Sequence, residues 1–351
     1  MNPGFCLLLL CALSIFFSSA AAAERAATPN GCNLFIGSWV REDAYLPLYQ
    51  SSSCPFIGEG FDCQRNGRPD TDYLKYRWKP AECDLLRFDG RDFLERNRGK
   101  KILFVGDSLS NNMWRSLLCM IHAAVPDGNL SQPQDLFTYH VPAYVVSISR
   151  LKNPFLVDLK REKVGKVLKL DSITTGGKWK GMDVLIFNSY HWWNHRGRLQ
   201  SWDYFQVGNE TRKYMDRMEA YEIAMTTWAK WIDSNINPAK TAVFFLGVSA
   251  VHVNSMDWGG TAGGTCRGET QPVEGPSYPG PSVPGESIIR AVISKMQNPA
   301  HLLDITLLTQ LRKDGHPSTF AGINLSDCSH WCLAGVPDTW NDILYTMLLD
   351  S

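Results

Sequence analysis

Three residues of this 351-residue chain have the types and spacing of a nucleophilic triad. Ser108 follows the apolar run 102–105 in the string I-L-F-V-G-D-S-L-S, and the amphipathic stretch 111–122 comes next. That order predicts a buried strand, a tight turn and a helix start, with the serine hydroxyl at the turn. Asp327 and His330 lie one helical turn apart, in D-C-S-H-W. A serine nucleophile needs a base and the base needs an orienting group, so the three residues predict acyl transfer or ester hydrolysis.

The position of Ser108 also predicts an oxyanion site. Backbone N–H groups at a helix N-terminus, with the positive end of the helix dipole, favour a developing negative charge. Asn188 ends the apolar run 183–188, and its side-chain amide is a second candidate donor. Structural alternatives stay open, because G-D-S also fits an ordinary turn and helix cap, and Asn188 also fits a turn former after a strand.

His316 is a rival for the general base. Asp314 precedes it by two residues in R-K-D-G-H-P-S, a spacing that suits an Asx turn better than a catalytic pair. A shared turn can instead hold Asp327 and His330 on one side, so that the carboxylate fixes the tautomer of the imidazole. The pattern therefore ranks His330 first and leaves His316 as a competitor.

Six residues are candidates for binding a substrate. Aromatic side chains in loops suit the apolar faces of sugar rings, although core packing is the commoner role of a single tryptophan. Histidines that follow the strand candidate 183–188 lie where a pocket would form. The candidates are Asp107, His191, Trp192, Trp193, Trp258 and His316.

Neither a metal centre nor a nucleic-acid partner is predicted. The sequence has no H-E-x-x-H motif, and its cysteines fit disulfides better than zinc ligands. No Gly-rich phosphate loop with its lysine follows a strand. The formal net charge is zero and no basic block is present, which argues against nucleic acid. We expect no bound metal and no bound cofactor.

From about residue 100 the sequence alternates between strand and helix patterns. Apolar runs predict strands at 101–106, 155–159, 183–188, 241–248 and 302–308. Three- and four-residue periodicity predicts helices at 109–122, 211–235, 286–297 and 338–349. The alternation predicts an α/β fold in which helices flank a parallel sheet and ligands bind beyond the carboxyl ends of the strands. Ser108, Asn188 and Ser249 follow strand candidates in this way.

The N-terminus predicts entry into the secretory pathway. Residues 5–17 form a continuous apolar run, and Ala20 to Ala23 supply a cleavage site of small residues. Residues 1–23 are therefore predicted to be a signal peptide, with an uncleaved signal anchor as the alternative because the segment approaches bilayer length. Two of the ten cysteines lie in it, and the remaining even number implies disulfides formed in an oxidising lumen. Candidate glycosylation sites agree with this route: Asn129, Asn209 and Asn324.

The rest of the chain divides into two predicted regions. Residues 24–98 are rich in cysteine and turn-forming residues and too poor in apolar residues to fold well alone. We expect this region to pack on a catalytic domain formed by residues 99–351. Within that domain the Gly- and Pro-rich stretch 258–285 is too long for a plain connection, and Cys266 is expected to tether it as an ordered functional loop.

The motifs jointly resemble the trichome-birefringence-like family of plant proteins, relatives of GDSL/SGNH esterases. The resemblance covers nearly all of the chain after the signal. It rests on C-N-L-F-I-G-S-W-V, N-G-R-P-D…Y-R-W-K-P, V-G-D-S-L-S-N-N, F-N-S-Y-H-W-W, R-K-D-G-H-P-S and D-C-S-H-W-C-L-A-G-V-P-D-T-W-N-D-I-L. Many relatives carry Gln where this chain has Met113, and the residue at Asn111 also varies; neither difference touches the triad.

The resemblance implies O-acetylation of a plant cell-wall polysaccharide (xylan, another hemicellulose or pectin) in the Golgi or after secretion. It implies an SGNH-like fold and an acetyl donor, either acetyl-CoA or another carrier. It places the nucleophile at Ser108, the acid and base at Asp327 and His330, and oxyanion donors at Ser108 and Asn188. It gives His316 a structural or binding role.

The resemblance further implies four disulfides: Cys32–Cys83, Cys54–Cys119, Cys63–Cys332 and Cys266–Cys328. Two other functions remain open. The same triad would make a polysaccharide acetylesterase if water attacked the acetyl ester, and a wall-polysaccharide binding protein would need no triad at all. The oligomeric state is not predicted.

Overall fold

The computed structural model describes residues 31–133, 135–323 and 325–349. The predicted signal peptide 1–23 and the sequon at Asn324 lie outside these residues. Within the described ranges, no helix combines the length and the apolar character that a bilayer span requires.

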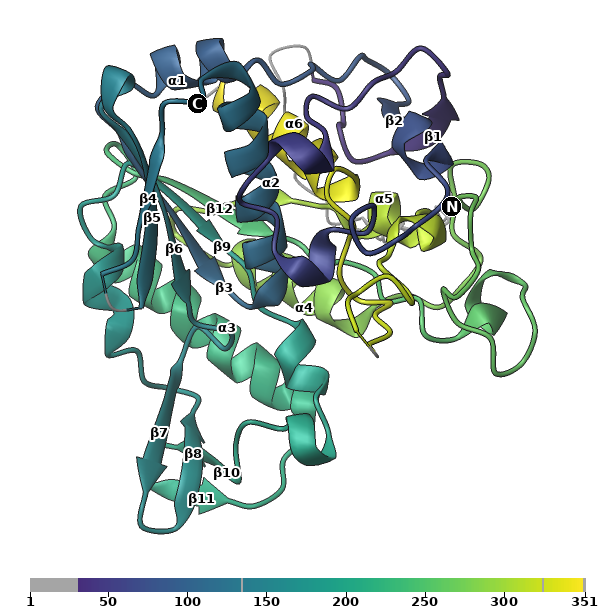
Figure 1. Ribbon diagram of the computed structural model, residues 1–351. Coiled ribbons are helices and arrows are strands. Elements are labelled where there is room, and N and C mark those ends of the chain that lie inside the picture. Colours follow the sequence, from purple (N-terminus) through teal and green to yellow (C-terminus); the bar gives the residue numbers. More distant parts are fainter. Residues whose placement is uncertain (1–30, 134, 324, 350–351) are drawn as a thin grey trace, which may run out of the picture.

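A seven-stranded sheet forms the centre of the molecule (Figure 1). Its spatial order is β13-β12-β9-β3-β6-β5-β4; the first five strands run parallel, and β5 and β4 are antiparallel additions at one edge. In chain order the strands are β3 (Lys101–Gly106), β4 (Asn129–Ser131), β5 (Leu136–Val141), β6 (Val146–Lys152), β9 (Val184–Phe187), β12 (Ala242–Leu246) and β13 (His301–Leu303).

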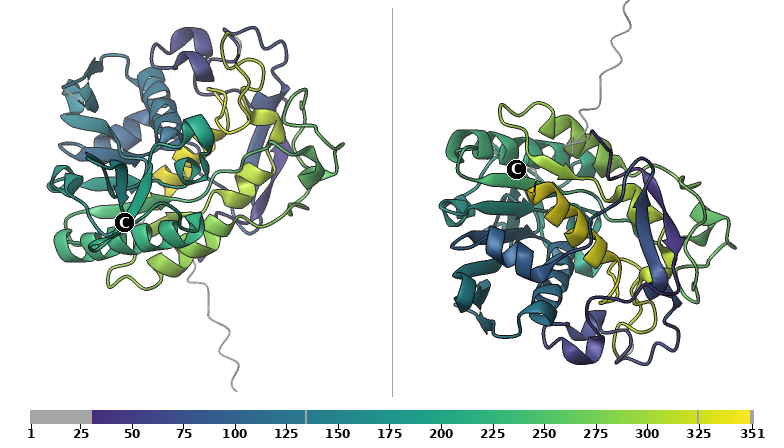
Figure 2. Two further views of the ribbon diagram at one scale, coloured as in Figure 1. Left: turned by 90° about the horizontal axis from the view of Figure 1, so that it is seen from below. Right: turned by 90° about the horizontal axis from the view of Figure 1, so that it is seen from above.

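Different helices cover the two faces of this sheet (Figures 1 and 2). One face carries three helices and the other carries two: α1 (Gly90–Arg96), α2 (Ser108–Ala124) and α6 (Val336–Leu348), then α3 (Arg217–Asn235) and α4 (Pro284–Ile293). Because side chains alternate along a strand, β3 serves both cores. Ile102 and Phe104 pack with α2 and α6, and Leu103 and Val105 pack with α3 and α4. The predicted α/β fold with helices flanking a largely parallel sheet is confirmed.

The N-terminal region packs on the first helical face instead of forming a separate core. Its antiparallel strands β1 (Gly37–Arg41) and β2 (Tyr76–Pro80) form a two-stranded sheet. Trp78 and Leu34 are buried in the same core as α2 and α6. Four disulfides join the cysteines of the described residues: Cys32–Cys83, Cys54–Cys119, Cys63–Cys332 and Cys266–Cys328. They are the four pairs that the resemblance implies, and two of them join the N-terminal region to the rest of the fold.

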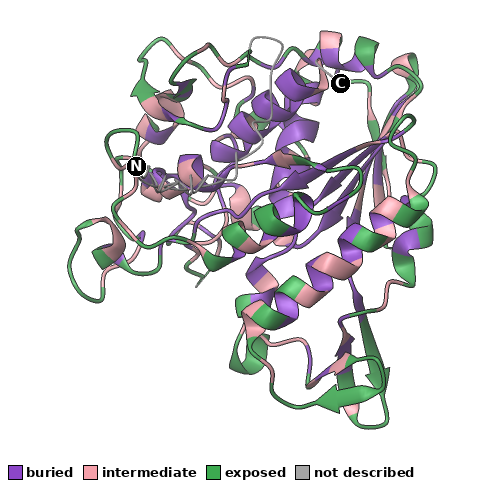
Figure 3. Ribbon diagram, turned by 180° about the vertical axis from the view of Figure 1, so that it is seen from behind, coloured by how far each residue is buried: buried purple, intermediate pink, exposed green. Residues whose placement is uncertain are grey.

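A second, four-stranded sheet projects from the main body (Figure 1). Its order is β11-β10-β8-β7, from β7 (Asp158–Glu162), β8 (Gly165–Lys169), β10 (Tyr204–Val207) and β11 (Glu210–Arg212). Figure 3 shows that the central sheet is buried whereas much of this projecting sheet is exposed. Asn209 lies exposed in the turn between β10 and β11, and Asn129 lies exposed on β4.

Several predicted elements need correction. The run 155–159 was expected in the central sheet, but β7 starts at Asp158 and belongs to the projecting sheet. On the side of β3 away from β9, the neighbouring strand is β6, whose serines and arginine interrupt its apolar pattern. The run 302–308 yields β13 only as far as Leu303, and the short helix α5 (Thr306–Gln310) follows.

The predicted helix 211–235 begins later than its periodicity indicates. Residues 210–212 form β11, and α3 starts at Arg217 because Asp216 caps it. The Asp216 carboxylate accepts hydrogen bonds from the backbone N–H groups of Met218 and Glu219 at 2.8 and 3.0 Å. The predicted helix 286–297 corresponds to α4, which ends at Ile293.

Candidate active site

Ser108 is the first residue of α2 and follows the end of β3 by two residues. Asp107 caps the helix, because its Oδ1 accepts a hydrogen bond from the N–H of Leu109 at 2.9 Å. A Cβ added at Gly106 would lie 2.4 Å from the carbonyl oxygen of Asn188. Glycine at this position therefore lets the ends of β3 and β9 approach closely, which brings Asn188 beside the turn that carries Ser108.

Asp107 also fixes the loop after β9. Its Oδ2 accepts hydrogen bonds from the N–H groups of Tyr190 and His191 at 3.4 and 3.2 Å. The side chain is 1% exposed and its two oxygens receive three backbone donors. The expectation that Asp107 binds a substrate is therefore wrong: burial and these bonds give the carboxylate a structural role.

His330 and Asp327 form a hydrogen-bonded pair at 2.5 Å between Nδ1 and Oδ2. The other carboxylate oxygen, Oδ1, accepts the backbone N–H of Ser329 at 2.8 Å and that of His330 at 3.1 Å. Burial opposes ionisation of Asp327, but the hydrogen bond and charge of His330 and the donors of Ser329 outweigh it and lower the pKa of Asp327. An ionised carboxylate only accepts hydrogen bonds, so Nδ1 of His330 carries the hydrogen.

The opposite edge of the His330 ring is poised to accept a proton. When Nδ1 carries the hydrogen of a neutral imidazole, Nε2 holds a lone pair. Nε2 is buried and has no hydrogen-bond partner in the described structure. The arrangement has the chemistry of a general base whose tautomer is set by a carboxylate.

Asn112 joins the His330 segment to the helix that begins at Ser108. Its side-chain oxygen accepts the N–H of Trp331 at 2.8 Å, and its amide nitrogen donates to the Trp331 carbonyl at 3.2 Å. Residues four apart share one face of a helix, so Ser108 lies one turn from this double hydrogen bond and on the same side of α2. The described structure has no direct hydrogen bond from Ser108 to His330. Such catalytic contacts commonly tighten only when a substrate is bound.

His316 contacts the backbone of the His330 segment. His316 Nδ1 donates to the backbone carbonyl of His330 at 2.6 Å, and its ring stacks on Trp331 with a centroid separation of 4.0 Å. Asp314 does not pair with it, because both Asp314 oxygens accept hydrogen bonds from the buried guanidinium of Arg312. His316 is 1% exposed, so a substrate-binding role is excluded by burial, and its contacts are those of a positioning residue.

A second histidine extends this support. His252 Nδ1 lies 2.7 Å from His316 Nε2, and His252 Nε2 donates to the carbonyl of Gln310 at 2.9 Å. Two neutral rings carry two hydrogens, whereas the three contacts of the pair require three. Full hydrogen bonding thus needs one shared proton. Burial opposes that protonation: it lowers the pKa of His252 to about 4 and that of His316 well below its usual value.

The remaining predicted residues have mixed environments. Asn188 is buried, and its side-chain oxygen has no hydrogen-bond partner in the described structure. His191 is buried with Nε2 3.0 Å from the carbonyl oxygen of Ser249. Trp258 is half-buried, donates to Glu269 at 3.0 Å and packs against His252.

The two adjacent tryptophans differ. Trp193 is fully buried and packs against Phe155, Trp202 and Tyr221. The prediction that it binds a substrate is therefore wrong, because its side chain is part of the apolar core. Trp192 is only half-buried, and its role in binding a substrate stays a prediction.

Sequence reasoning missed three residues that organise the site. Asn112 and His252 offer no local pattern, because each acts through a partner distant in the sequence. The hydroxyl of Ser249, which was noted only as following a strand, accepts the indole N–H of Trp331 at 2.8 Å. Asn112 is fully buried on an apolar face of α2. A polar residue at such a position in a predicted helix is a sequence signal for a buried hydrogen-bond partner.

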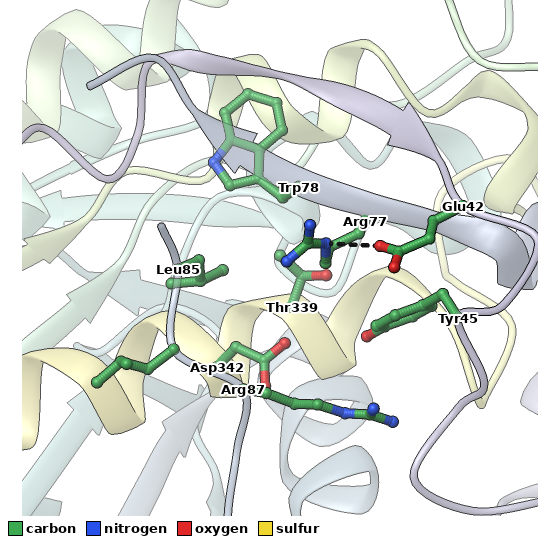
Figure 4. Close-up of a pocket in the computed structure, with 9 residues that line it drawn as sticks. Glu42, Tyr45, Arg77, Trp78, Leu85, Arg87, Thr339 and Asp342 are labelled. Atoms are coloured by element: carbon green, nitrogen blue, oxygen red, sulfur yellow. Dashed lines mark ion pairs between the residues drawn. The ribbon is translucent and has the colours of Figure 1, made fainter. Parts of the chain in front are cut away.

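A cavity of about 150 Å³ lies away from these residues, between the β1–β2 sheet and α6 (Figure 4). Arg77 pairs with Glu42 on one side of it at 3.2 Å, and Asp342 points into it from α6. None of the residues lining this cavity belongs to the candidate triad. Its size alone therefore does not make it the active site.

Comparison with known proteins identifies the family. The family described as "GDSL/SGNH-like Acyl-Esterase family found in Pmr5 and Cas1p" matches residues 85–347, and the "PMR5 N terminal Domain" matches residues 30–84. The Arabidopsis thaliana protein trichome birefringence-like 42 is 58% identical over 91% of this chain and 89% of its own length.

The chain belongs to the trichome birefringence-like family. Two other Arabidopsis members, trichome birefringence-like 41 and trichome birefringence-like 43, are 50% and 52% identical, each over 91% of this chain and 91% and 89% of their own lengths. The family membership supports an acyl-transfer or acyl-ester-cleaving enzyme in general.

Proposed function

We propose that this trichome birefringence-like protein is an O-acetyltransferase that acetylates hydroxyls of a plant cell-wall polysaccharide. Ser108 is the nucleophile, His330 the general base and acid, and Asp327 the group that orients His330. The observation that carries the proposal is the His330–Asp327 pair, in which His330 Nε2 has no partner among the described residues. Asn112 joins the next residue, Trp331, to the helix headed by Ser108.

The reaction has two half-steps. In the first, Ser108 Oγ attacks the carbonyl carbon of the acetyl donor as its proton passes to His330 Nε2. The N–H of Ser108 and the side chain of Asn188 stabilise the oxyanion. The intermediate then collapses, His330 gives its proton to the departing donor group, and the acetyl group remains on Ser108 as an ester.

The second half-step transfers the acetyl group. A sugar hydroxyl attacks the ester carbonyl while His330 Nε2 takes the hydroxyl proton. Collapse releases the acetylated sugar, and Ser108 Oγ regains its proton from His330. Asp327 stays ionised throughout and stabilises the imidazolium that forms twice per cycle.

The acceptor, the donor and the compartment complete the proposal. The acceptor is xylan, another hemicellulose or pectin, and the donor is acetyl-CoA or another acetyl carrier. The protein requires no bound cofactor for these steps. It acts in the secretory pathway, in the Golgi or at the cell wall, which agrees with its four disulfides.

The test is acetyl transfer to de-acetylated polymers. The purified protein is incubated with an acetyl donor and separate preparations of xylan, glucomannan, xyloglucan and polygalacturonan, and acetyl gain is measured by mass spectrometry. We expect gain on at least one polymer, lost in Ser108→Ala. A Ser108→Ala protein with near-normal transfer would contradict the proposal.

A polysaccharide acetylesterase is the second candidate, favoured by the acyl-esterase description of the matching family. It uses the same residues but admits water to the acetyl-serine. Incubation with acetylated polymers distinguishes the two activities. Release of acetate without any acetyl gain on de-acetylated polymers would establish the esterase.

A further inference from the structure

Lys152 lies beside the turn that carries Ser108. It is the last residue of β6 and is paired in register with Gly106, the last residue of β3. The next residue, Asn153, donates its backbone N–H to the Gly106 carbonyl at 3.0 Å. The β6 backbone therefore places Lys152 next to a residue only two positions before the nucleophile.

Trp192 lies next to Lys152 but follows β9, the strand that flanks β3 on the side away from β6. It belongs to the short 3₁₀ helix His191–Asn194 after β9, which Asp107 holds through the N–H of His191 at 3.2 Å. The Lys152 ammonium nitrogen lies 4.6 Å from the centre of the Trp192 ring, a cation–π distance. The His195 ring lies 5.4 Å from the Trp192 ring. Trp192 therefore serves as a support for Lys152.

The Lys152 side chain is exposed, and no carboxylate pairs with it among the described residues. An ammonium held over an aromatic ring at the rim of a site, without an internal counter-ion, suits an anionic group on a ligand. The carboxylate in the turn that carries Ser108, Asp107, is buried and already receives three backbone N–H groups.

The segment that begins at Lys152 has an excess of positive charge. Residues 152–217 contain 13 Lys and Arg against seven Asp and Glu, whereas the whole chain contains 35 of each. This segment includes the whole projecting sheet (Figure 1). Its exposed cations without an ion pair in the described structure include Arg161, Lys163, Lys166, Arg196 and Arg198.

We propose that Lys152, supported by Trp192, binds the carboxylate of a uronic-acid residue in the acceptor, so that the preferred acceptor is an anionic polysaccharide. This inference rests on the proposed acetyltransferase function. An acetyl donor with a single anionic group is the alternative ligand, but it would pair with Lys152 and leave the other cations of the segment without a partner. A polymer with a carboxylate on successive sugars can also use the other exposed cations of residues 152–217, and their number favours the polymer.

The experiment compares Lys152→Gln with a matched control, Lys180→Gln. Lys180 is also exposed and lies over a tryptophan, Trp231 at 5.7 Å. It precedes β9, so it lies at the amino end of the parallel strands, whereas Ser108 and Lys152 lie at their carboxyl end. The donor is the uncharged ester 4-nitrophenyl acetate, so any effect of charge belongs to the acceptor. Acceptors are an oligogalacturonide and a neutral xylo-oligosaccharide, and binding of each is also measured by calorimetry without a donor.

We expect Lys152→Gln to raise the KM and the Kd for the oligogalacturonide about fivefold, the upper range for one exposed ion pair. The reversed charge in Lys152→Glu should raise them further, and added salt should reduce the difference from the wild type. The xylo-oligosaccharide and the Lys180→Gln protein should show no change.

Equal oligogalacturonide binding by the wild type and Lys152→Gln would overturn the inference. So would an equal loss of binding for both acceptors. If the wild type binds the oligogalacturonide through Lys152 but acetylates no polymer, the inference stands and the proposed transferase function fails. Because binding is measured without a donor, the two failures are distinguishable.

Discussion

Replacing either of the two competing histidines by asparagine separates a catalytic from a positioning role. In both cases the asparagine amide nitrogen can occupy the place of Nδ1 and donate to the same acceptor, Asp327 for position 330 and the His330 carbonyl for position 316. Both substitutions delete the Nε2 edge of the ring. The matched pair therefore tests what each Nε2 atom does.

We predict that His330→Asn lowers kcat by a factor on the order of 10⁴, because the proposed base is lost. Its effect on stability should be small, since the side chain is 21% exposed and its Nε2 has no partner in the described structure. His316→Asn removes a buried contact to His252 and the stacking on Trp331, which together should cost about 2–4 kcal/mol of unfolding free energy. Its kcat should stay within about tenfold of the wild type while the protein is folded.

The assay is turnover of 4-nitrophenyl acetate at a temperature where thermal unfolding shows each variant to be folded. With about 2 °C lost per kcal/mol in a protein of this size, His316→Asn should unfold about 4–8 °C lower than the wild type. The reverse result would refute the reasoning: a stable His316→Asn protein without turnover, beside an active His330→Asn protein, would make His316 the base.

Three further predictions concern charge and tethering. Asp327→Asn should lower kcat about 10⁴-fold at a temperature where the variant is folded, because an amide cannot hold the reactive tautomer of His330; an intact kcat would remove Asp327 from the mechanism. Burial raises the pKa of Asp342 from 3.8 to about 7, so the folded state binds the extra proton and stability should fall as the pH rises between these values. Asp342→Asn should flatten this dependence in thermal scans at pH 5 and pH 8, and an unchanged slope would contradict it. Replacing both Cys266 and Cys328 by serine should cost about 2–5 kcal/mol in a denaturant titration and lower kcat, since the bridge tethers the loop next to Asp327; equal activity would show that the tether is purely structural.

The fold class could be predicted from the sequence because the strand and helix patterns are each local. The apolar run before Ser108 and the amphipathic run after it lie within one turn of each other, and the structure makes them β3 and α2. Strand β6 was missed because polar residues interrupt its apolar pattern, although its residues 147–152 pair with all of β3. Strand β6 is stabilised by pairing with its neighbours β3 and β5. Its own residues do not show which strands it pairs with.

The site shows the same division between local and distant information. The spacing of Asp327 and His330 was enough to predict their pairing, since both lie on one turn. The spacing could not predict that His316 contacts the His330 backbone or that Asn112 holds Trp331, because these contacts join segments far apart in the sequence. Trp193 was misjudged because a tryptophan in a loop can point either to solvent or to the core, and here the apolar side chains beneath it decide.

The acetyl-enzyme at Ser108 is the most direct test of the proposed mechanism. The protein is incubated with an isotopically labelled acetyl donor without an acceptor, quenched in acid and digested, and the peptide containing Ser108 is analysed by mass spectrometry. We predict one labelled acetyl group on Ser108, which disappears when the polysaccharide acceptor is added and is absent from Ser108→Ala. A protein that turns over substrate while the label is found on another residue, or on none, would contradict this mechanism.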